Sequence, residues 1–534
     1  MGKINSLGVM LDCSRDAVYT VETLGNFFKL ISAMGYSTVQ LYTEDTFEVD
    51  GEPYFGYLRG RYSETELKEI DRLAAENGLE LIPCIQTLAH LGGVTRWEDE
   101  YMCCTDAEGI LLADEDRTYT LIEHIFASLA KCFTSRRVNI GMDEAHLIGL
   151  GRYLDKHGFV DRVDLLLRHL RRVLEIAEKY GFCPMMWSDM FFRLVSGGEY
   201  ENSAKEIPSE IAAKIPENLD LIYWDYGNFD EAHYRAVIKA HRRMNRRIVF
   251  AGGSWTWSGF VPDNALAIKA SEAAIRACIN EGIEEAFVTC WKDDGAECSL
   301  FGALPTLMCV AEFAKGNFDR VEIAKKFKNV TGVEWDDFAA IERMNLKNKI
   351  DTLANPCKYM LYADPFLGIF DTTVNGTEAE TFAQIGKRLE TVNNSKFGYI
   401  FDTYIALCDV LQIKYALGVK TRNAYTNRDM NALLSLTEEY SELERRVETF
   451  YFKFRSQWGK ECKPHGFEKH DVRLGGLLFR IRHCRETIKE FCAGERSEIA
   501  QLDETILPFK QKIPAGSSIY FNDWLYSAMI KPKM

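Results

Sequence analysis

Short apolar runs alternate with longer segments of helical periodicity from the start of the chain to about residue 310. The runs are rich in β-branched and aromatic residues, as strands are, whereas the segments between them repeat apolar residues every three or four positions, as amphipathic helices do. The pattern predicts eight strands, at residues 6–12, 38–42, 79–86, 138–143, 184–189, 219–225, 247–251 and 286–291. Helices are predicted at residues 21–31, 121–131, 160–180, 232–243 and 265–280, and another begins at Ser63, where Ser-Glu-Thr-Glu has the form of a capping box.

Eight strands that alternate with helices make up a (β/α)8 TIM barrel, an α/β fold whose catalytic side chains lie at the C-terminal ends of the strands. An open doubly wound sheet has the same alternation. That fold would carry a glycine-rich phosphate-binding turn after the first strand, and residues 11–15, Leu-Asp-Cys-Ser-Arg, are not one. The barrel is therefore the preferred interpretation.

The strand pattern stops near Leu307, and long amphipathic, charge-rich segments follow. Helices are predicted there at residues 338–349, 377–391, 401–418, 430–455 and 472–494. We expect two domains, a catalytic barrel over residues 1–310 and an α-helical C-terminal domain over residues 311–534.

Composition narrows the classes of function. The chain has 534 residues, 47% of them hydrophobic, and its formal net charge of −15 repels nucleic-acid phosphates without a compensating basic stripe. No apolar run approaches the roughly 20 residues that span a bilayer, and the N-terminus lacks the pattern of a signal peptide. We expect neither a nucleic-acid partner nor a membrane.

The fifteen cysteines are scattered, many of them within apolar runs. Their odd number and their contexts suit free thiols in a reducing compartment, so we expect a cytoplasmic location. The only adjacent pair is Cys103 and Cys104, and no CxxC motif couples to a second one. No zinc site, other metal site or cofactor is predicted.

Acidic and aromatic residues gather where the predicted strands end. Asp143 and Glu144 close the fourth strand, and because successive side chains leave a strand on opposite faces, one or both must serve a cleft. The other strand ends carry Asp12 and Arg15, Glu44 and Asp45, Gln86 and His90, Trp187 and Asp189, Trp224, Asp225 and Tyr226, Trp255 and Trp257, and Trp291 with Asp293 and Asp294. Indole faces that stack on a sugar ring, beside charged groups that bind hydroxyls, make a sugar pocket in physical terms.

Each of these residues also has a structural interpretation. A tryptophan at a strand end is often a lid on the core, and His90 could be a buried structural histidine. A metal site at Asp143, Glu144 and His146 would need a second histidine cluster at ligand spacing, which the sequence lacks. The same residues spell the helicase box Asp-Glu-Ala-His, but the GxxxxGK[ST] run that binds phosphate in such proteins is absent.

The motifs at these strand ends resemble glycoside hydrolase family 20, the β-N-acetylhexosaminidases. Residues 139–144, Asn-Ile-Gly-Met-Asp-Glu, are similar to the family's strand-four motif His-x-Gly-Gly-Asp-Glu. Residues 8–15 resemble its first-strand segment, in which an arginine holds sugar hydroxyls. The resemblance covers about the first 300 residues. It implies that Trp187, Trp224 and Trp291 form the acetamido pocket and that Tyr226 binds the acetamide.

The chain departs from the family pattern in several places. Asn139 replaces the histidine of the strand-four motif and Met142 its second glycine. Trp-Lys-Asp293 stands where the family has Trp-x-Glu, and Leu-Ala-His90 where it has Pro-Gly-His. We expect a divergent branch without the α/β domain that commonly precedes the family's barrel.

The resemblance implies an exo-acting, retaining enzyme that removes a terminal, non-reducing β-linked N-acetylglucosamine or N-acetylgalactosamine by substrate-assisted catalysis. The acetamide oxygen would attack C1 to form an oxazolinium intermediate, with Asp143 orienting the acetamide and Glu144 acting as acid and base. The substrate is then a terminal 2-acetamido-2-deoxy-hexose of an oligosaccharide or glycoconjugate. Substrate-binding roles would fall to Arg15, Glu44, His90, Trp187, Trp224, Asp225, Tyr226, Trp255, Trp291 and Asp293.

Other interpretations stay open. A conventional two-carboxylate barrel glycosidase would pair Glu144 with Asp189 or Asp225. A sugar-binding protein without catalysis is the alternative from another class. A homodimer through the helical domain is also left open.

Overall fold

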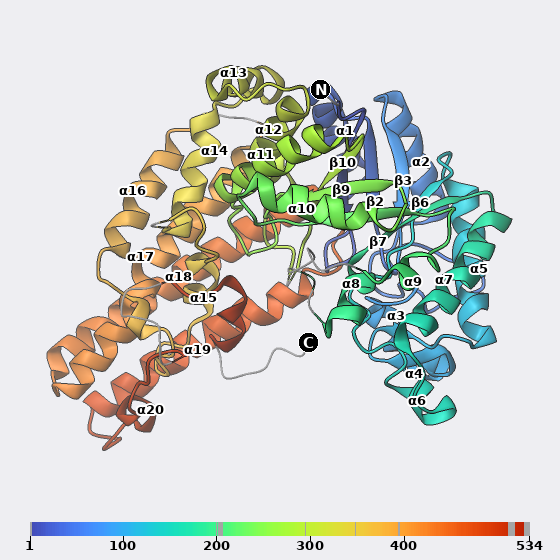
Figure 1. The fold of residues 1–534 in the computed structure, drawn as a ribbon. Coiled ribbons are helices and arrows are strands. Elements are labelled where there is room, and N and C mark those ends of the chain that lie inside the picture. Colours follow the sequence, from blue (N-terminus) through green and yellow to red (C-terminus); the bar gives the residue numbers. More distant parts are fainter. Residues whose placement is uncertain are drawn as a thin grey trace. The chain divides into compact units, whose positions relative to one another are not determined.

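The computed structural model describes residues 3–198, 200, 207–293, 295–347, 349–392, 396–510 and 518–527. Eight parallel strands close into a barrel in the order β1-β10-β9-β8-β7-β6-β3-β2 (Figure 1). Strand β1 (Ser6–Asp12) pairs in parallel with β10 (Glu285–Cys290) on one side and with β2 (Thr38–Tyr42) on the other, which closes the ring. The predicted TIM-barrel fold is confirmed.

Every barrel strand overlaps the run predicted for it. The other five are β3 (Glu80–Cys84), β6 (Arg137–Asn139), β7 (Cys183–Trp187), β8 (Asp220–Trp224) and β9 (Ile248–Gly253). Two further strands, β4 (Thr105–Ala107) and β5 (Ile110–Leu111), form a separate antiparallel pair. The sequence pattern does not predict this pair, because two or three residues are too few to show a period.

Helices follow the barrel strands and cover them (Figure 1). The longer ones are α1 (Val21–Met34), α2 (Glu64–Glu76), α5 (Asp116–Cys132), α7 (Arg162–Lys179), α8 (Asp189–Ser196), α10 (Glu231–Arg242), α11 (Asn264–Glu281) and α12 (Leu304–Ala314). Short helices α3 (Gly92–Thr95), α4 (Glu98–Tyr101), α6 (Arg152–His157) and α9 (Ser209–Ala212) lie in the connections. The predicted capping box is present at α2, where Ser63 and Glu66 exchange side chain-to-backbone hydrogen bonds.

Charged residues close the N-terminal end of the barrel. Glu285, the first residue of β10, is buried and forms ion pairs with Arg137 at the start of β6 and, at 2.6 Å, with Arg247. Arg247 also pairs with Asp220 at 2.6 Å, and Arg137 with Glu80 at 3.5 Å. In TIM barrels this end serves stability, which leaves the opposite end for function.

The fourth barrel strand, β6, is shorter than predicted. It ends at Asn139, and the next residues leave the strand conformation, with φ of +73° at Gly141, +70° at Met142 and +52° at Glu144. Only glycine adopts such angles without strain, so this turn stores conformational energy. Asp143 therefore lies in a sharp turn beyond the strand end, not in the strand itself.

The chain divides into two compact units. The barrel unit comprises Met1–Trp255, Ala267–Lys292 and Thr306–Lys326, and the helical unit comprises Thr256–Leu266, Asp293–Pro305 and Phe327–Met534. The division is thus not a single point in the sequence. Two short segments that precede residue 310 belong to the helical unit.

Long helices dominate the helical unit. The longest are α17 (Gly398–Thr426), α18 (Met430–Glu461) and α19 (Glu468–Cys492), preceded by α14 (Trp335–Glu342), α15 (Pro356–Tyr362) and α16 (Glu378–Glu390), and followed by α20 (Ala500–Asp503). Helix α13 (Arg320–Thr331) begins in the barrel unit and ends in the helical unit. The helix predicted at 338–349 ends early, because a 3-10 turn over Arg343–Asn345 and a left-handed Leu346 interrupt it. Among the described residues, no helix combines the length and apolar character that crossing a membrane requires.

Candidate active site

Asp143 is buried at the C-terminal end of the barrel. The Gln86 side-chain amide donates a 2.7 Å hydrogen bond to Asp143 Oδ1, and His90 Nε2 lies 3.3 Å from Asp143 Oδ2. Burial tends to raise the pKa of Asp143, but the charge on His90 and the contacts of His90 and Gln86 outweigh it, so the pKa lies below its ordinary value. The carboxylate is thus held ionised at neutral pH.

Glu144 differs from its neighbour in exposure. Its side chain is 41% exposed, and it lies 3.6 Å from His90 Nε2 and 3.5 Å from the Arg193 guanidinium. Its backbone N–H donates a 3.1 Å hydrogen bond to Asp189 Oδ2. The two members of this acid pair, Asp143 and Glu144, therefore have different environments, one buried and bonded, the other open to an incoming ligand.

His90 joins the two carboxylates. It has a left-handed backbone, with φ of +54°. Burial lowers the pKa of its imidazole, but the charge of Asp143 and the contact with it raise the pKa above the ordinary 6.5, to about 9. His90 is therefore a cation at neutral pH, and one positive charge lies against the acid pair.

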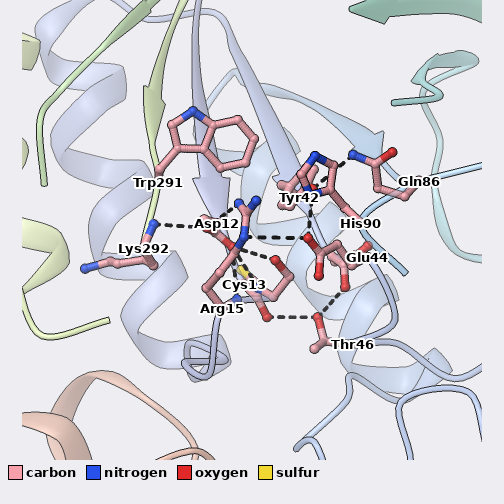
Figure 2. A network of polar contacts seen from close by, with 12 residues as sticks. Asp12, Cys13, Arg15, Tyr42, Glu44, Thr46, Gln86, His90, Trp291 and Lys292 are labelled. Atoms are coloured by element: carbon pink, nitrogen blue, oxygen red, sulfur yellow. Dashed lines mark hydrogen bonds and ion pairs between the residues drawn. The ribbon is translucent and has the colours of Figure 1, made fainter. Parts of the chain in front are cut away.

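Arg15 lies at the end of β1, between Trp291 and Glu44 (Figure 2). Its guanidinium is 4.7 Å from the centre of the Trp291 ring, and its Nε is 3.6 Å from Glu44 Oε1. Buried Asp12 fixes this position, because Asp12 Oδ2 accepts a 3.1 Å hydrogen bond from the guanidinium and another, of 3.0 Å, from the backbone of Lys292. The structure thus brings three of the predicted hydroxyl-binding and stacking residues together.

Aromatic rings form a wall beside the acid pair. Trp291 Nε1 donates a 3.0 Å hydrogen bond to the Tyr226 hydroxyl, and the Trp224 ring stacks on Tyr226 at 5.2 Å. Trp187 lies 6.1 Å from Trp291, and Trp255 Nε1 donates to the Tyr226 carbonyl at 2.6 Å. The five aromatic residues, predicted from four strand ends, therefore form one connected cluster.

Two predicted substrate-binding residues are placed differently. Asp225 is engaged by its own surroundings, because its Oδ2 accepts hydrogen bonds from His233 at 2.8 Å and Tyr223 at 3.1 Å. These hydrogen bonds are a structural role for Asp225 that involves no substrate. Asp293 is exposed and belongs to the helical unit, so its substrate-binding role stays a prediction. Asp294 lies outside the described residues.

Sequence reasoning overlooked the residues that orient the acid pair. The sequence indicates only that Gln86 lies at a strand end, yet its amide donates to Asp143. The same amide donates to the Tyr42 hydroxyl, which in turn donates to Glu44 (Figure 2). Arg193 pairs with Asp189 at 3.0 Å on one turn of α8 and reaches Glu144. The i,i+4 spacing of Asp189 and Arg193 was the available signal for that pair.

No group of three or more metal-binding side chains is found in the part of the chain that the structure describes. The positive charge beside the carboxylates comes instead from His90, Arg15 and Arg193. The prediction that no cofactor is needed stays a prediction.

An eight-stranded parallel barrel with an acid pair, an arginine and an aromatic wall at its C-terminal strand ends defines the class of barrel glycoside hydrolases. Comparison with known families agrees. The description "Glycosyl hydrolase family 20, catalytic domain" matches residues 36–233, and "Glycoside Hydrolase 20C C-terminal domain" matches residues 336–519. The chain belongs to glycoside hydrolase family 20, the β-N-acetylhexosaminidase family.

Curated relatives point to the same family. The chain is 25% identical over 264 residues to Hexosaminidase D of Bos taurus, a match that covers 46% of this chain and 69% of the relative. It is 26% identical over 237 residues to Hexosaminidase D of Homo sapiens, covering 41% of this chain and 44% of the relative. The second match thus spans less than half of the human protein.

Among solved structures, the chain is similar to an exo β-N-acetylglucosaminidase of family 20 from Vibrio harveyi, with 16% identity and a TM-score of 0.48. That match covers 64% of this chain and 59% of the other. A β-N-acetylhexosaminidase from Bacteroides fragilis matches at 20% identity and a TM-score of 0.44, covering 58% of this chain and 65% of the other.

Proposed function

We propose that this chain is an exo-acting, retaining β-N-acetylhexosaminidase that uses substrate-assisted catalysis. Its substrate would be a terminal, non-reducing β-linked N-acetylglucosamine or N-acetylgalactosamine. The observation that carries the proposal is the unequal acid pair, in which Asp143 is buried and kept ionised while adjacent Glu144 is open to solvent. Two carboxylates with different environments can take different roles in one reaction.

Asp143 suits the stabilisation of a positive charge. When the acetamide oxygen attacks C1, the C1–O bond to the leaving group breaks and positive charge develops on the acetamide. An ionised carboxylate, fixed by Gln86 and His90, would accept the acetamide N–H and stabilise that charge without reorganising. Tyr226 would donate its hydroxyl hydrogen to the acetamide oxygen, and the indoles of Trp187, Trp224 and Trp291 would enclose the methyl group.

Glu144 suits proton transfer. It would give its proton to the leaving oxygen as the oxazolinium forms, and then take a proton from the water that attacks C1. Two displacements at C1 retain its configuration. Two contacts would hold the Glu144 carboxyl group in position beside the leaving oxygen. The Glu144 backbone donates a hydrogen bond to Asp189, and the Glu144 side chain contacts Arg193.

The other predicted residues would bind the outer part of the sugar. Arg15 and Glu44, 3.6 Å apart, would take the hydroxyls of the terminal residue, and the Trp291 ring beside them would limit the pocket to one sugar. Such a closed end would make the enzyme exo-acting. No disulfide joins any of the fifteen cysteines in the described structure, which supports our further proposal of a reducing, cytoplasmic location.

The two-carboxylate alternative has weaker support. A conventional retaining pair needs carboxyl groups about 5 Å apart on opposite faces of the sugar. Asp189 is fully buried and bonds to the backbone of Glu144 itself, and Asp225 is occupied by His233 and Tyr223. Neither arrangement leaves a second carboxylate facing Glu144 across a sugar.

Kinetics of two isosteric variants test the proposal. Asp143→Asn should lower kcat for 2-acetamido glycosides by a factor on the order of 1,000, about 4 kcal/mol, because the positive intermediate loses its counter-charge. Glu144→Gln should lose a similar factor on a disaccharide, whose leaving group needs a proton, and far less on an activated aryl glycoside, whose leaving group does not.

The wild type should also bind a thiazoline analogue of N-acetylglucosamine tightly, since that compound resembles the oxazolinium intermediate. Unchanged turnover by Asp143→Asn would contradict substrate assistance. Equal losses by Glu144→Gln on both substrates would contradict its role as the acid. Binding of the sugar without any hydrolysis by the wild type would favour the non-catalytic alternative.

A further inference from the structure

An exposed aromatic cluster lies on the loops that follow β2 and β3. Tyr54, Tyr57 and Trp97 contact one another in pairs, with ring centroids 5.9, 5.4 and 5.5 Å apart. Tyr57 is 43% exposed, and the neighbouring Leu58 is 62% exposed with a left-handed φ of +65°. A bulky residue rarely adopts this angle, and strained backbone that displays apolar side chains is concentrated at ligand sites.

A cavity of about 470 Å³ is lined by residues on both sides of Trp97 in the chain, though by none of the three rings themselves. Its size lies within the range of small-molecule sites. Arg96 and Glu98, which flank Trp97, form part of the wall, and Glu108 and Arg152 stand among the other lining residues. The Arg96 guanidinium lies 5.1 Å from the centre of the Trp97 ring. In the described structure neither the Glu98 nor the Glu108 carboxylate has a hydrogen-bonding or ion-pairing partner, so both can accept hydrogen bonds from hydroxyls.

The cavity is linked to the acid pair through His90. Gly92, a lining residue, follows His90 by two positions, and His90 contacts both Asp143 and Glu144. The segment between them is fixed, because Leu91 N donates to the Gly109 carbonyl and Gly109 N to the Thr95 hydroxyl, each at 3.0 Å. The cavity therefore has a rigid connection to the catalytic strand ends.

The aromatic cluster is linked to the same strand ends through Asp45. Arg59 Nε lies 3.1 Å from buried Asp45 Oδ1, and a Cβ on Gly56 would be 2.0 Å from the Asp45 carbonyl, so the loop packs directly on that residue. Tyr57 is one residue from Gly56, and Glu44 one residue from Asp45. With consecutive Cα atoms 3.8 Å apart, the Tyr57 and Glu44 backbones are separated by no more than on the order of 10 Å.

We propose that this cavity and the Tyr54–Tyr57–Trp97 cluster bind the sugars on the leaving side of the scissile bond. The inference rests on the exo-acting function proposed above. A pocket that closes around the terminal sugar has no place for residues beyond it, so any further sugar bound at this barrel end belongs to the leaving part of the glycan.

The chemistry fits a neutral β-linked oligosaccharide. Aromatic faces stack on the apolar face of a pyranose, while Glu98, Glu108 and Arg96 offer acceptors and donors for its hydroxyls. Charges of both signs line the cavity, which disfavours a strongly anionic occupant. The subsite would give the enzyme a preference for longer glycans over short ones.

Tyr57→Ala tests the proposal on the full-length enzyme, with the β-linked di- and trisaccharides of N-acetylglucosamine as substrates. Loss of one stacking ring should lower kcat/KM for the trisaccharide about three- to tenfold and for the disaccharide less. Tyr57→Phe keeps the ring and should keep the wild-type ratio of the two values. The inhibition constant of the thiazoline analogue, which fills only the terminal-sugar pocket, should not change.

A control is Tyr526→Ala, which removes a still more exposed tyrosine from the helical unit, at 54% exposure against 43% for Tyr57. Tyr526→Ala should leave kcat/KM for both the disaccharide and the trisaccharide unchanged. Unchanged kcat/KM in Tyr57→Ala would overturn the subsite alone, as would a weakened thiazoline affinity, since the change would then have reached the terminal-sugar pocket. Failure of the wild type to hydrolyse either glycan would overturn the proposed function together with the subsite.

Discussion

A histidine cation and a buried carboxylate stabilise each other at the centre of this site. His90 has its pKa raised to about 9, mainly by Asp143 acting against burial, and Asp143 has its pKa lowered by His90 and Gln86 against the same effect. The pair is therefore fully ionised between the lowered pKa of Asp143 and about pH 9. Within that range the carboxylate that would face the substrate amide carries its charge.

The sign of the pH dependence follows from these shifts. The folded-state pKa of His90 lies above the unfolded value of 6.5, so its contribution to stability is complete below pH 6.5 and is lost as the pH rises through about 9. Titration of isotope-labelled histidine by NMR should place His90 near 9 in the wild type. In Asp143→Asn the pKa of His90 should fall, because burial then acts without the largest opposing charge. A His90 pKa that is equal in both proteins would contradict the pairing.

At the scale of the element, the turn after β6 decides how the acid pair is presented. Three residues of positive φ at Gly141, Met142 and Glu144 send Asp143 into the barrel end and leave Glu144 exposed. Gly141 allows this turn to approach β3, because a Cβ there would lie 2.1 Å from Gln86 Oε1. The same oxygen accepts a 3.1 Å hydrogen bond from Met142 N, so Gln86 supports the turn and Asp143 together.

Gly141→Ala should therefore damage both stability and turnover. The positive φ alone should cost about 1 kcal/mol, and the clash should displace Gln86 and with it Asp143, lowering kcat by a factor on the order of 100. Gly181→Ala is a matched control, since Gly181 has a φ of +75° but nothing within 4 Å of its Cβ position. It should lose the same conformational energy in a denaturant titration and retain kcat. Equal kcat in the two variants would contradict the role assigned to the turn.

At the scale of the whole molecule, the barrel unit separates stability from chemistry by its two ends. Glu285 is buried and forms ion pairs with Arg137 and Arg247, so these pairs join the starts of three strands at one end of the barrel. The aromatic wall and the acid pair occupy the other end. Substitutions at the first end should therefore change the free energy of unfolding without reaching the chemistry.

Glu285→Gln should lower the free energy of unfolding by about 1.5–3 kcal/mol, because Arg137 and Arg247 lose their charged hydrogen bonds to Glu285 but keep Glu80 and Asp220 as partners. Well below the unfolding temperature, kcat/KM should stay within a factor of two or so of the wild type. Glu272→Gln is the control, because Glu272 also contacts two arginines, Arg276 and Arg320, but at a more exposed site, where about 1 kcal/mol or less is expected. Thermal unfolding and steady-state kinetics of both variants check this. A large loss of kcat/KM in Glu285→Gln would show that the two ends are coupled.

The sequence by itself determined the fold class, the positions of the eight strands and the identity of the acid pair. Period-two and period-3.6 patterns are local, and Asp143 and Glu144 are adjacent in the chain, so neither needs tertiary information. Predicted strand ends also located Arg15, His90, Trp291 and the other aromatic residues of the wall, because parallel strands in a barrel all end at one face.

Only the tertiary structure decided which of these residues act together and how. Strand β6 ends early, at Asn139, because the close approach of Gly141 to Gln86 requires a glycine turn, and no local pattern contains a residue 55 positions away. The partners of Asp143, the separate engagement of Asp225, and the cavity beside Trp97 likewise depend on contacts between distant segments. Hydrophobic periodicity reports which side of an element is buried, but it carries no information on which polar groups meet there.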